Sequence, residues 1–184
     1  MERLIQLDQL ITININGLGP PFWDPFMVFI SRIYVWVPLY VAIGAYYFWK
    51  MTWKKALVSV LVLAAAFAFT DVSTHHMKTY IFCRLRPCHE PLLDGLLRLP
   101  AGKGGLYGFP SGHACNTFCF ALITSWLSRR RWWTVAILTW SLAISYSRIY
   151  LAMHYLGDVL AGLLFGAVAA SLAVCLLKFI FRKL

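Results

Sequence analysis

Long apolar runs separated by short polar segments dominate the chain. Before them, Leu4, Leu7, Leu10 and Ile11 recur at helical spacing with polar residues between them, a pattern typical of an amphipathic helix lying in a membrane interface. Five runs follow, each close to the length of about 20 residues that a helix needs to cross a bilayer. They cover residues 26–49, 56–82, 111–127, 132–150 and 158–179. The pattern predicts an all-α integral membrane bundle of about five to six transmembrane helices, with an N-terminal interfacial segment over residues 1–20.

The composition supports a single membrane domain over residues 1–184. Hydrophobic residues make up 60% of the chain, charged residues only 13%, and the mean hydropathy is +0.68. One soluble core of this size cannot hide so much apolar surface. The net charge of +10 raises the possibility of nucleic-acid binding, but the charges lie at the ends of apolar runs and not on one soluble face. We therefore expect no nucleic-acid partner.

The positions of the basic residues predict an orientation in the membrane. With five spans, three basic groups fall on one side, which the positive-inside rule makes cytoplasmic. These groups are Lys50, Lys54 and Lys55; Arg129, Arg130 and Arg131; and Lys178, Arg182 and Lys183. Loop 84–110, too polar and too rich in Gly and Pro to cross lipid, and turn 148–158 then lie on the opposite side. The expected location is the inner (cytoplasmic) membrane, with these two segments facing the periplasm or the cell exterior.

Three polar clusters fall at the outer ends of the predicted spans. They are Lys78 with Arg84, Arg86 and Pro87; Pro110-Ser111-Gly112-His113; and Ser147-Arg148 with His154 and Asp158. Ionisable residues at such positions are costly, so they indicate a functional site.

The second cluster has the features of an anion site at a helix start. Ser111 is a good N-cap residue, and Gly112 allows a ligand to approach the backbone. Free N–H groups and the helix dipole favour an anion there, within reach of His113. The alternative is an ordinary helix cap next to an interfacial histidine.

The other clusters suggest a nucleophile and a set of phosphate ligands. His154 and Asp158 are four residues apart, so on one helical turn the carboxylate would fix the imidazole tautomer. A buried polar pair that only stabilises the bundle is the alternative. Lys78, Arg86 and Arg148 bring three cations to one face without three acids, which indicates a ligand with several negative charges, such as phosphate. Anchoring to anionic lipid headgroups would also explain them.

Metal chemistry and disulfide bonding have weaker support in the sequence. None of the five histidines belongs to an H-E-x-x-H pairing, and the surplus of cations would repel a metal ion. We therefore expect no metal and no other cofactor. Cys83 and Cys88 flank the Arg-Pro motif and could form a disulfide if their loop is extracytoplasmic.

Taken together, the clusters resemble the signature of the type 2 phosphatidic acid phosphatase family, which also includes vanadium haloperoxidases. Pro110-Ser111-Gly112-His113 matches the second part of that signature, and Ser147-Arg148 with His154 and Asp158 matches the third. The first part departs from it. The family has six residues between its Lys and its Arg-Pro, whereas seven separate Lys78 from Arg86, which suggests an extra residue near Tyr80–Cys83.

The resemblance implies a role for each matched residue. His154 would be the nucleophile that forms a phosphohistidine, Asp158 would orient it, and His113 would be the general acid and base. The phosphate would be held by Lys78, Arg86, Ser111, Gly112 and Arg148. Asp71 and His75 share helical spacing with Lys78, so either could support it, or the three could form a structural network.

The sequence thus predicts a metal-independent membrane enzyme that hydrolyses a lipid phosphomonoester or diphosphate. Undecaprenyl diphosphate and phosphatidylglycerol phosphate are favoured as substrates, because the short chain leaves little room for a domain that holds a large saccharide headgroup. A lipid A phosphatase or a phosphotransferase of the same family is the alternative. A non-enzymatic lipid or anion transporter is the alternative from another class.

Overall fold

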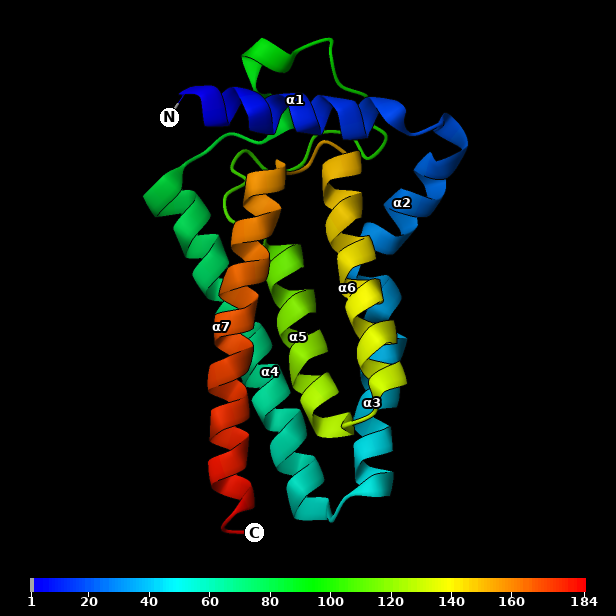
Figure 1. Cartoon of the computed structure of the whole chain (residues 1–184), viewed down its shortest axis with the longest axis vertical. Coiled ribbons are helices and arrows are strands. Elements are labelled where there is room, and N and C mark those ends of the chain that lie inside the picture. The colour runs from blue at the N-terminus through cyan, green and yellow to red at the C-terminus, as the bar shows by residue number, and fades with distance from the viewer. Residues whose placement is uncertain (1) are drawn as a thin grey trace.

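The computed structural model describes residues 2–184, and its helices form a bundle crossed at one end by the N-terminal helix (Figure 1). The α-helices are α1 (Glu2–Leu18), α2 (Asp24–Ser31), α3 (Val37–Lys50), α4 (Trp53–His76), α5 (Gly112–Ser128), α6 (Arg131–Tyr150) and α7 (Leu156–Phe181). Short helical turns lie at η1 (Pro21–Trp23), η2 (Ile33–Trp36), η4 (Pro87–His89) and η5 (Pro91–Leu93), and η3 (Met77–Phe82) is a π-helix. Over residues 2–184 there is no strand, only an isolated bridge between Leu85 and Tyr107.

Close packing of α5 against α7 forms the centre of the bundle. A Cβ atom on Gly162 would lie 2.4 Å from the carbonyl oxygen of Ser111, and one on Gly166 would lie 2.5 Å from that of Cys115. The two glycines therefore let the backbones of α5 and α7 touch, as small residues do between membrane helices. This contact fixes the start of α5 against the first turn of α7, where several candidate site residues lie.

The prediction of an all-helical membrane protein is confirmed, but its number of spans is not. Within residues 2–184, two helical segments, Trp53–Phe82 and Leu156–Phe181, are long and apolar enough to cross a bilayer, or three if the bent pair Pro21–Ser31 and Ile33–Lys50 counts as one span. Helices α5 and α6 occupy the predicted runs 111–127 and 132–150 without reaching that combination of length and hydropathy. The number of five to six spans stays a prediction.

The first apolar run is not the single continuous helix that the sequence suggested. Its two helical parts meet at an angle of 67°, and Arg32 between them is extended (φ −83°, ψ 123°). Pro38 in the first turn of α3 lacks a backbone donor, and its ring would clash with the carbonyl four residues earlier in a continuous helix. The break places Ser31 and Arg32 beside the candidate site.

Helix α1 packs its polar face on the bundle and leaves its apolar face exposed. Thr12 and Asn16 are fully buried, whereas Leu7 and Leu10 are exposed. The Asn16 amide donates to the carbonyl of Tyr150 (2.7 Å) and accepts from the backbone N–H of Arg98 (2.8 Å). These bonds tie α1 to the end of α6 and to loop 84–110.

Loop 84–110 folds back on itself over the same end of the bundle as α1 (Figure 1). The N–H of Arg86 donates to Leu106 (3.0 Å), and that of Gly108 donates to Arg84 (2.8 Å). The loop is therefore an ordered cap. Cys83 and Cys88 are free thiols, so the structure does not contain the disulfide considered from the sequence.

The three basic groups used to orient the chain lie together at the other end. Figure 1 shows the α3–α4 and α5–α6 connections and the C-terminus at this end, opposite α1. The distribution of charge between the two ends is as expected. Which end faces the cytoplasm stays a prediction.

Candidate active site

The candidate residues gather from six segments at the end of the bundle that α1 and loop 84–110 cover. Arg148 lies near the end of α6, His154 in the turn before α7, and Asp158 in the first turn of α7. Ser111, Gly112 and His113 form the start of α5, Lys78 lies in η3, and Arg86 lies in the loop. His154, Asp158, Ser111 and Arg148 are all buried.

His154 and Asp158 form the predicted pair. The Nδ1 atom of His154 lies 3.4 Å from Oδ2 of Asp158, and the backbone N–H of Tyr155 donates to the same oxygen at 3.1 Å. The first distance is long for a hydrogen bond, but it places the carboxylate directly beside Nδ1. Since Nδ1 faces the acid, Nε2 is the nitrogen left to react.

A second layer of contacts holds Asp158 from the other side. Nη1 of Arg84 donates to Oδ1 of Asp158 at 2.8 Å, and Nη2 of Arg84 donates to Asp8 of α1 at 2.8 Å. Asp8 also accepts from the backbone N–H of Gly157 at 2.9 Å. The N-terminal helix is thus bonded directly to the first turn of α7.

Ser111 and Gly112 begin α5 next to this pair. The N–H of Ser111 donates to the backbone carbonyl of Asp158 (2.9 Å), and the Ser111 hydroxyl accepts weakly from the N–H of Ala114 (3.5 Å). A Cβ on Gly112 would lie 3.1 Å from Oγ1 of Thr74 and 3.6 Å from Nζ of Lys78. The ammonium of Lys78 therefore lies beside the helix start that the sequence marked as an anion site.

Ser31 at the end of α2 joins two candidate residues. Its hydroxyl accepts from Nη1 of Arg148, and its carbonyl lies 3.1 Å from Nε2 of His113. Because a carbonyl can only accept, Nε2 of His113 carries the proton in this contact. The side chain of His113 is thus held at the site by a residue 82 positions away.

The guanidinium groups of Arg86 and Arg148 line one cavity. Nε of Arg86 donates to the carbonyl of Tyr107 (3.0 Å), which fixes its orientation. The cavity has a volume of about 390 Å³ and is also lined by Ser31, Arg32 and Met153. It is within the size range of small-ligand pockets, roughly 300–1,000 Å³.

Electrostatics keep the candidate nucleophile neutral. Burial is the main cause that lowers the pKa of His154 well below its usual value, followed by the charges of Arg148, Arg86 and Lys78, while the backbone of Gly108 acts in the opposite direction. A neutral imidazole has a free lone pair, which a nucleophile needs. The same cations that suit a phosphate therefore also favour the reactive form of the histidine.

Comparison with known proteins decides the family. A model of the PAP2 superfamily matches residues 55–182, a range that contains Lys78, Arg86, His113 and His154. The chain belongs to the PAP2 superfamily. This confirms the predicted enzyme class, a lipid phosphate phosphatase.

Individual PAP2 relatives match nearly the whole chain. It is 35% identical over 168 residues to a lipid A 4'-phosphatase of Bacteroides thetaiotaomicron, which covers 90% of this chain and 75% of the relative. It is 32% identical over 176 residues to an undecaprenyl-diphosphatase of Sulfolobus acidocaldarius, covering 94% and 74% of the two chains. The crystal structure of a phosphatidylglycerolphosphate phosphatase from Bacillus subtilis shares the fold, with a TM-score of 0.74, 21% identity and coverage of 100% and 89%.

The π-helix explains how the departure from the PAP2 signature is accommodated. A π-helix closes its hydrogen bonds over five residues and so holds one more residue per turn than an α-helix. Helix η3 (Met77–Phe82) begins just before Lys78 and overlaps the stretch where the sequence suggested an extra residue. Lys78 lies beside Gly112 although its spacing to Arg86 is longer than in the signature.

The polar stripe predicted along α4 is arranged differently. Asp71 accepts from Asn116 at 3.3 Å and His75 is exposed. Thr74, one turn before Lys78, lies beside Gly112, as Lys78 does. Among the described residues no hydrogen bond or ion pair joins Lys78 to Asp71 or His75, although the charge of Asp71 acts on Lys78 electrostatically.

The sequence assigned no role at the site to five further residues. Ser31, Asp8 and Gly108 carry no local signal, because only the fold brings them to the site. Arg32 and Arg84 stand out as charges, one within an apolar run and one in the first polar cluster, but their partners depend on the fold. Over residues 2–184, no group of three or more His, Cys, Asp or Glu is placed to hold a metal ion.

Proposed function

We propose that this PAP2 protein hydrolyses a lipid phosphomonoester or diphosphate through a phosphohistidine on Nε2 of His154. The observation that carries the proposal is a buried, neutral imidazole held beside Asp158 and surrounded by three cations. A structural His–Asp pair has no need of converging cations. A polyanionic group accounts for both features at once.

The first chemical step transfers the phosphoryl group to the protein. Nε2 of His154 attacks phosphorus, the P–N bond forms, and the P–O bond to the lipid breaks. The negative charge of the bound phosphate favours the protonated form of His113. This form gives its proton to the departing lipid oxygen and becomes neutral. Lys78, Arg86, Arg148 and the N–H groups at the start of α5 stabilise the charge on the phosphoryl oxygens.

The second step restores the histidine. His113, now neutral, takes a proton from water as that water attacks phosphorus. The P–N bond breaks and inorganic phosphate leaves. Asp158 keeps the imidazole oriented through both steps and stabilises its positive charge in the intermediate.

The proposed substrate is chosen from the names of the relatives and their sequence identity to this chain. Two relatives that match at least 90% of this chain are named as a lipid A 4'-phosphatase and an undecaprenyl-diphosphatase. We take the lipid A 4'-phosphate as the first candidate, because the identity to that relative is higher. Undecaprenyl diphosphate and phosphatidylglycerol phosphate are the next candidates.

We also propose that the site faces the periplasm or the cell exterior. The apolar face of α1 would lie in the outer interface and the basic end of the bundle in the cytoplasm. A lipid could then place its tail in the bilayer and its headgroup beneath α1. Labelling of Cys83, which is an exposed thiol, by an impermeant maleimide in intact cells and in inverted vesicles tests this orientation.

Phosphate release from a panel of purified lipids tests the function. The protein in detergent is assayed with lipid A, undecaprenyl diphosphate and phosphatidylglycerol phosphate, with a chelator present. We expect release from at least one of them, lowered by at least about a thousandfold in His154→Ala. Acid-labile, base-stable label on wild type but not on His154→Ala would support the phosphohistidine. Loss of activity in chelator alone, or full activity in His154→Ala, would contradict the proposal.

A further inference from the structure

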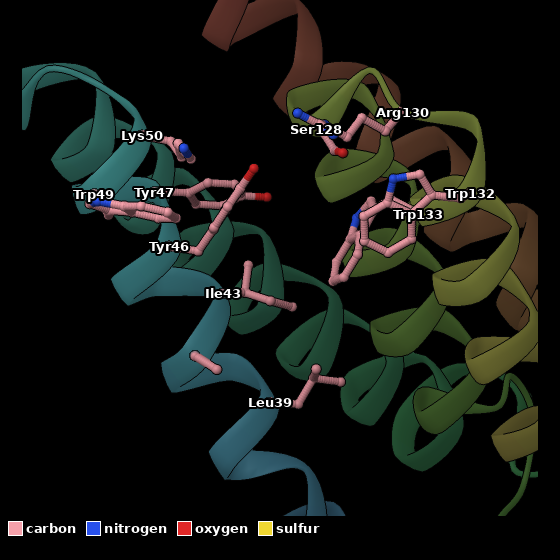
Figure 2. Close-up of a pocket in the computed structure, with 11 residues that line it drawn as sticks. Leu39, Ile43, Tyr46, Tyr47, Trp49, Lys50, Ser128, Arg130, Trp132 and Trp133 are labelled. Carbon is pink, nitrogen blue, oxygen red and sulfur yellow. The ribbon is translucent and has the colours of Figure 1, made fainter.

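A second cavity lies at the end of the bundle opposite the catalytic cluster. It has a volume of about 470 Å³ and lies between α3 on one side and the α5–α6 connection on the other. Figure 2 shows Tyr46 and Tyr47 on one wall and Trp132 and Trp133 on the facing wall. Leu39, Ala42 and Ile43 of α3 line its aliphatic part, and Figure 2 shows Leu39 and Ile43 farther from Lys50 than the aromatic rings. An aliphatic part next to an aromatic part suits an acyl chain that enters from lipid.

Two buried polar groups in these walls lack a partner. The hydroxyl of Tyr47 and the Nε1–H of Trp133 make no hydrogen bond to any described residue. Tyr47 is only 2% exposed, and Figure 2 shows its ring directed from α3 towards the cavity. Buried Tyr and Trp donors are normally satisfied, so two of them at one cavity indicate an acceptor supplied by a ligand.

The charges around the cavity have one sign. Lys50 and Arg130 lie at the same end of it in Figure 2, and among the residues that line it in the described chain there is no acid. Nζ of Lys50 lies 3.8 Å from the ring centroid of Trp49, which also lines the cavity. Two cations without a counter-ion at an aromatic rim favour an anionic group at headgroup depth.

From this combination, we propose that the cavity binds an anionic phospholipid. Its phosphate lies between Lys50 and Arg130, and an ester oxygen accepts from Tyr47 or Trp133. One acyl chain covers Leu39, Ala42 and Ile43. The lipid is a ligand and not a substrate, because neither His154 nor His113 is at this end. The inference does not depend on the proposed reaction.

The test is native mass spectrometry of the delipidated full chain with phosphatidylglycerol, a phosphodiester that offers no phosphomonoester. The His154→Ala background excludes turnover. The pocket variant is Lys50→Gln/Arg130→Gln. The matched control is Lys54→Gln/Arg131→Gln, which removes the same charge from exposed positions at the same end but outside the cavity.

We expect the pocket variant to weaken phosphatidylglycerol binding by on the order of tenfold, and the control by less than about twofold. Tyr47→Phe, which removes only the orphan hydroxyl, should weaken it severalfold. In the His154→Ala background, the pocket variant should have the same thermal melting temperature as His154→Ala alone. With His154 restored, it should keep phosphatase activity.

Three results would overturn the proposal. Equal loss of binding in the pocket and control variants would mean a diffuse attraction to the basic end. Equal binding of phosphatidylcholine would mean that the site does not select charge. Displacement of the lipid by inorganic phosphate at equal concentration would mean a phosphate site without a role for the acyl chain.

Discussion

Arg84 bonds to Asp158 at 2.8 Å through one nitrogen, while its second terminal nitrogen bonds to Asp8 at the same distance. The guanidinium carbon also lies 4.1 Å from the ring centroid of Tyr155, the residue after His154. Arg84 therefore holds the acid of the His154 pair in place and connects it to the N-terminal helix. A bidentate arginine with both partners fixed is a rigid support, since its planar fork allows little freedom.

Replacing Arg84 should impair catalysis more than substrate binding. Arg84→Ala leaves the buried carboxylate of Asp158 without its strongest partner, so the acid no longer fixes the imidazole. We expect kcat to fall by roughly tenfold to a hundredfold, as for other residues that orient a catalytic group. KM should change by less than about threefold, and steady-state kinetics on the preferred lipid measure both.

Two further variants separate positioning from simple tethering. Arg84→Lys keeps one charge-assisted bond and should restore part of kcat. Asp8→Asn frees α1 but leaves the bond between Arg84 and Asp158, so its kcat should fall less than that of Arg84→Ala. Equal losses in Arg84→Ala and Asp8→Asn, with no rescue by lysine, would show that Arg84 only anchors α1.

The dependence of kcat/KM on pH should show how the cations around His154 affect its protonation. Because burial and the charges of Arg148, Arg86 and Lys78 lower its pKa, His154 stays neutral as the pH falls below the usual value of about 6.5. Activity should therefore decline only in more acidic solution. Arg86→Gln removes a charge that opposes protonation, so the pKa rises and the acidic limb of kcat/KM moves to higher pH.

The pH at the midpoint of the acidic limb is compared between wild type and Arg86→Gln with the same lipid substrate. The phosphate group titrates in the same region, but it does so identically for both proteins. The maximum kcat/KM of Arg86→Gln should be lower than that of wild type, because this variant binds phosphate more weakly. This lower maximum does not change the pH at which the acidic limb falls. An unchanged or more acidic limb would contradict the electrostatic argument.

The sequence located the members of the candidate site better than their supports. Local spacing placed Ser111 at a helix start, as the structure has it, and brought His154 close to Asp158, although His154 lies in the turn before α7 and not on a shared helical turn. Ser31 and Asp8 could not be found in this way. They act across separations of 117 and 149 residues, on Arg148 and Gly157, and only the packing of the bundle creates these contacts.

The fold shows the same division between local and tertiary information. Apolar periodicity located the helices, but it merged α2 with α3, because Arg32 and Pro38 interrupt the backbone without interrupting the apolar run. The polar face of α1 was visible in the sequence as an interfacial pattern. The contact of this face with the protein through Asn16 could not be predicted, because its partners lie in α6 and in loop 84–110.

The π-helix allows a prediction by deletion. Removing Tyr80, whose side chain is 68% exposed, should let η3 close as an α-helix and keep Lys78 in register with Arg86. We expect kcat/KM to stay within about tenfold of wild type, given that Lys78 keeps its contact with Gly112.

Deleting Val72 is the matched control. It is 67% exposed and lies in regular α-helix, so its loss turns Lys78 by about 100° relative to the rest of α4. That deletion should abolish activity even if the protein remains folded by circular dichroism. Equal loss in both deletions would mean that the π-helix does not absorb the extra residue.

Gly108 offers the strictest test of the space around the catalytic pair. A Cβ at this position would lie 2.8 Å from Oδ2 of Asp158, 3.2 Å from Cγ of Arg86 and 3.5 Å from Nδ1 of His154. Gly108→Ala must therefore push the carboxylate away from the imidazole or move the loop, at a cost of about 1–3 kcal/mol. Because the closest clash is with the carboxylate of the catalytic pair, we expect kcat to fall at least tenfold while the melting temperature falls by a few degrees. Gly105→Ala is the control, because a Cβ there would lie 4.0 Å from its nearest neighbour, Nη2 of Arg86, and this variant should retain wild-type kcat. If Gly108→Ala were fully active at a normal melting temperature, the close approach of this loop to Asp158 and His154 would be wrong, and with it the geometry on which the proposed mechanism depends.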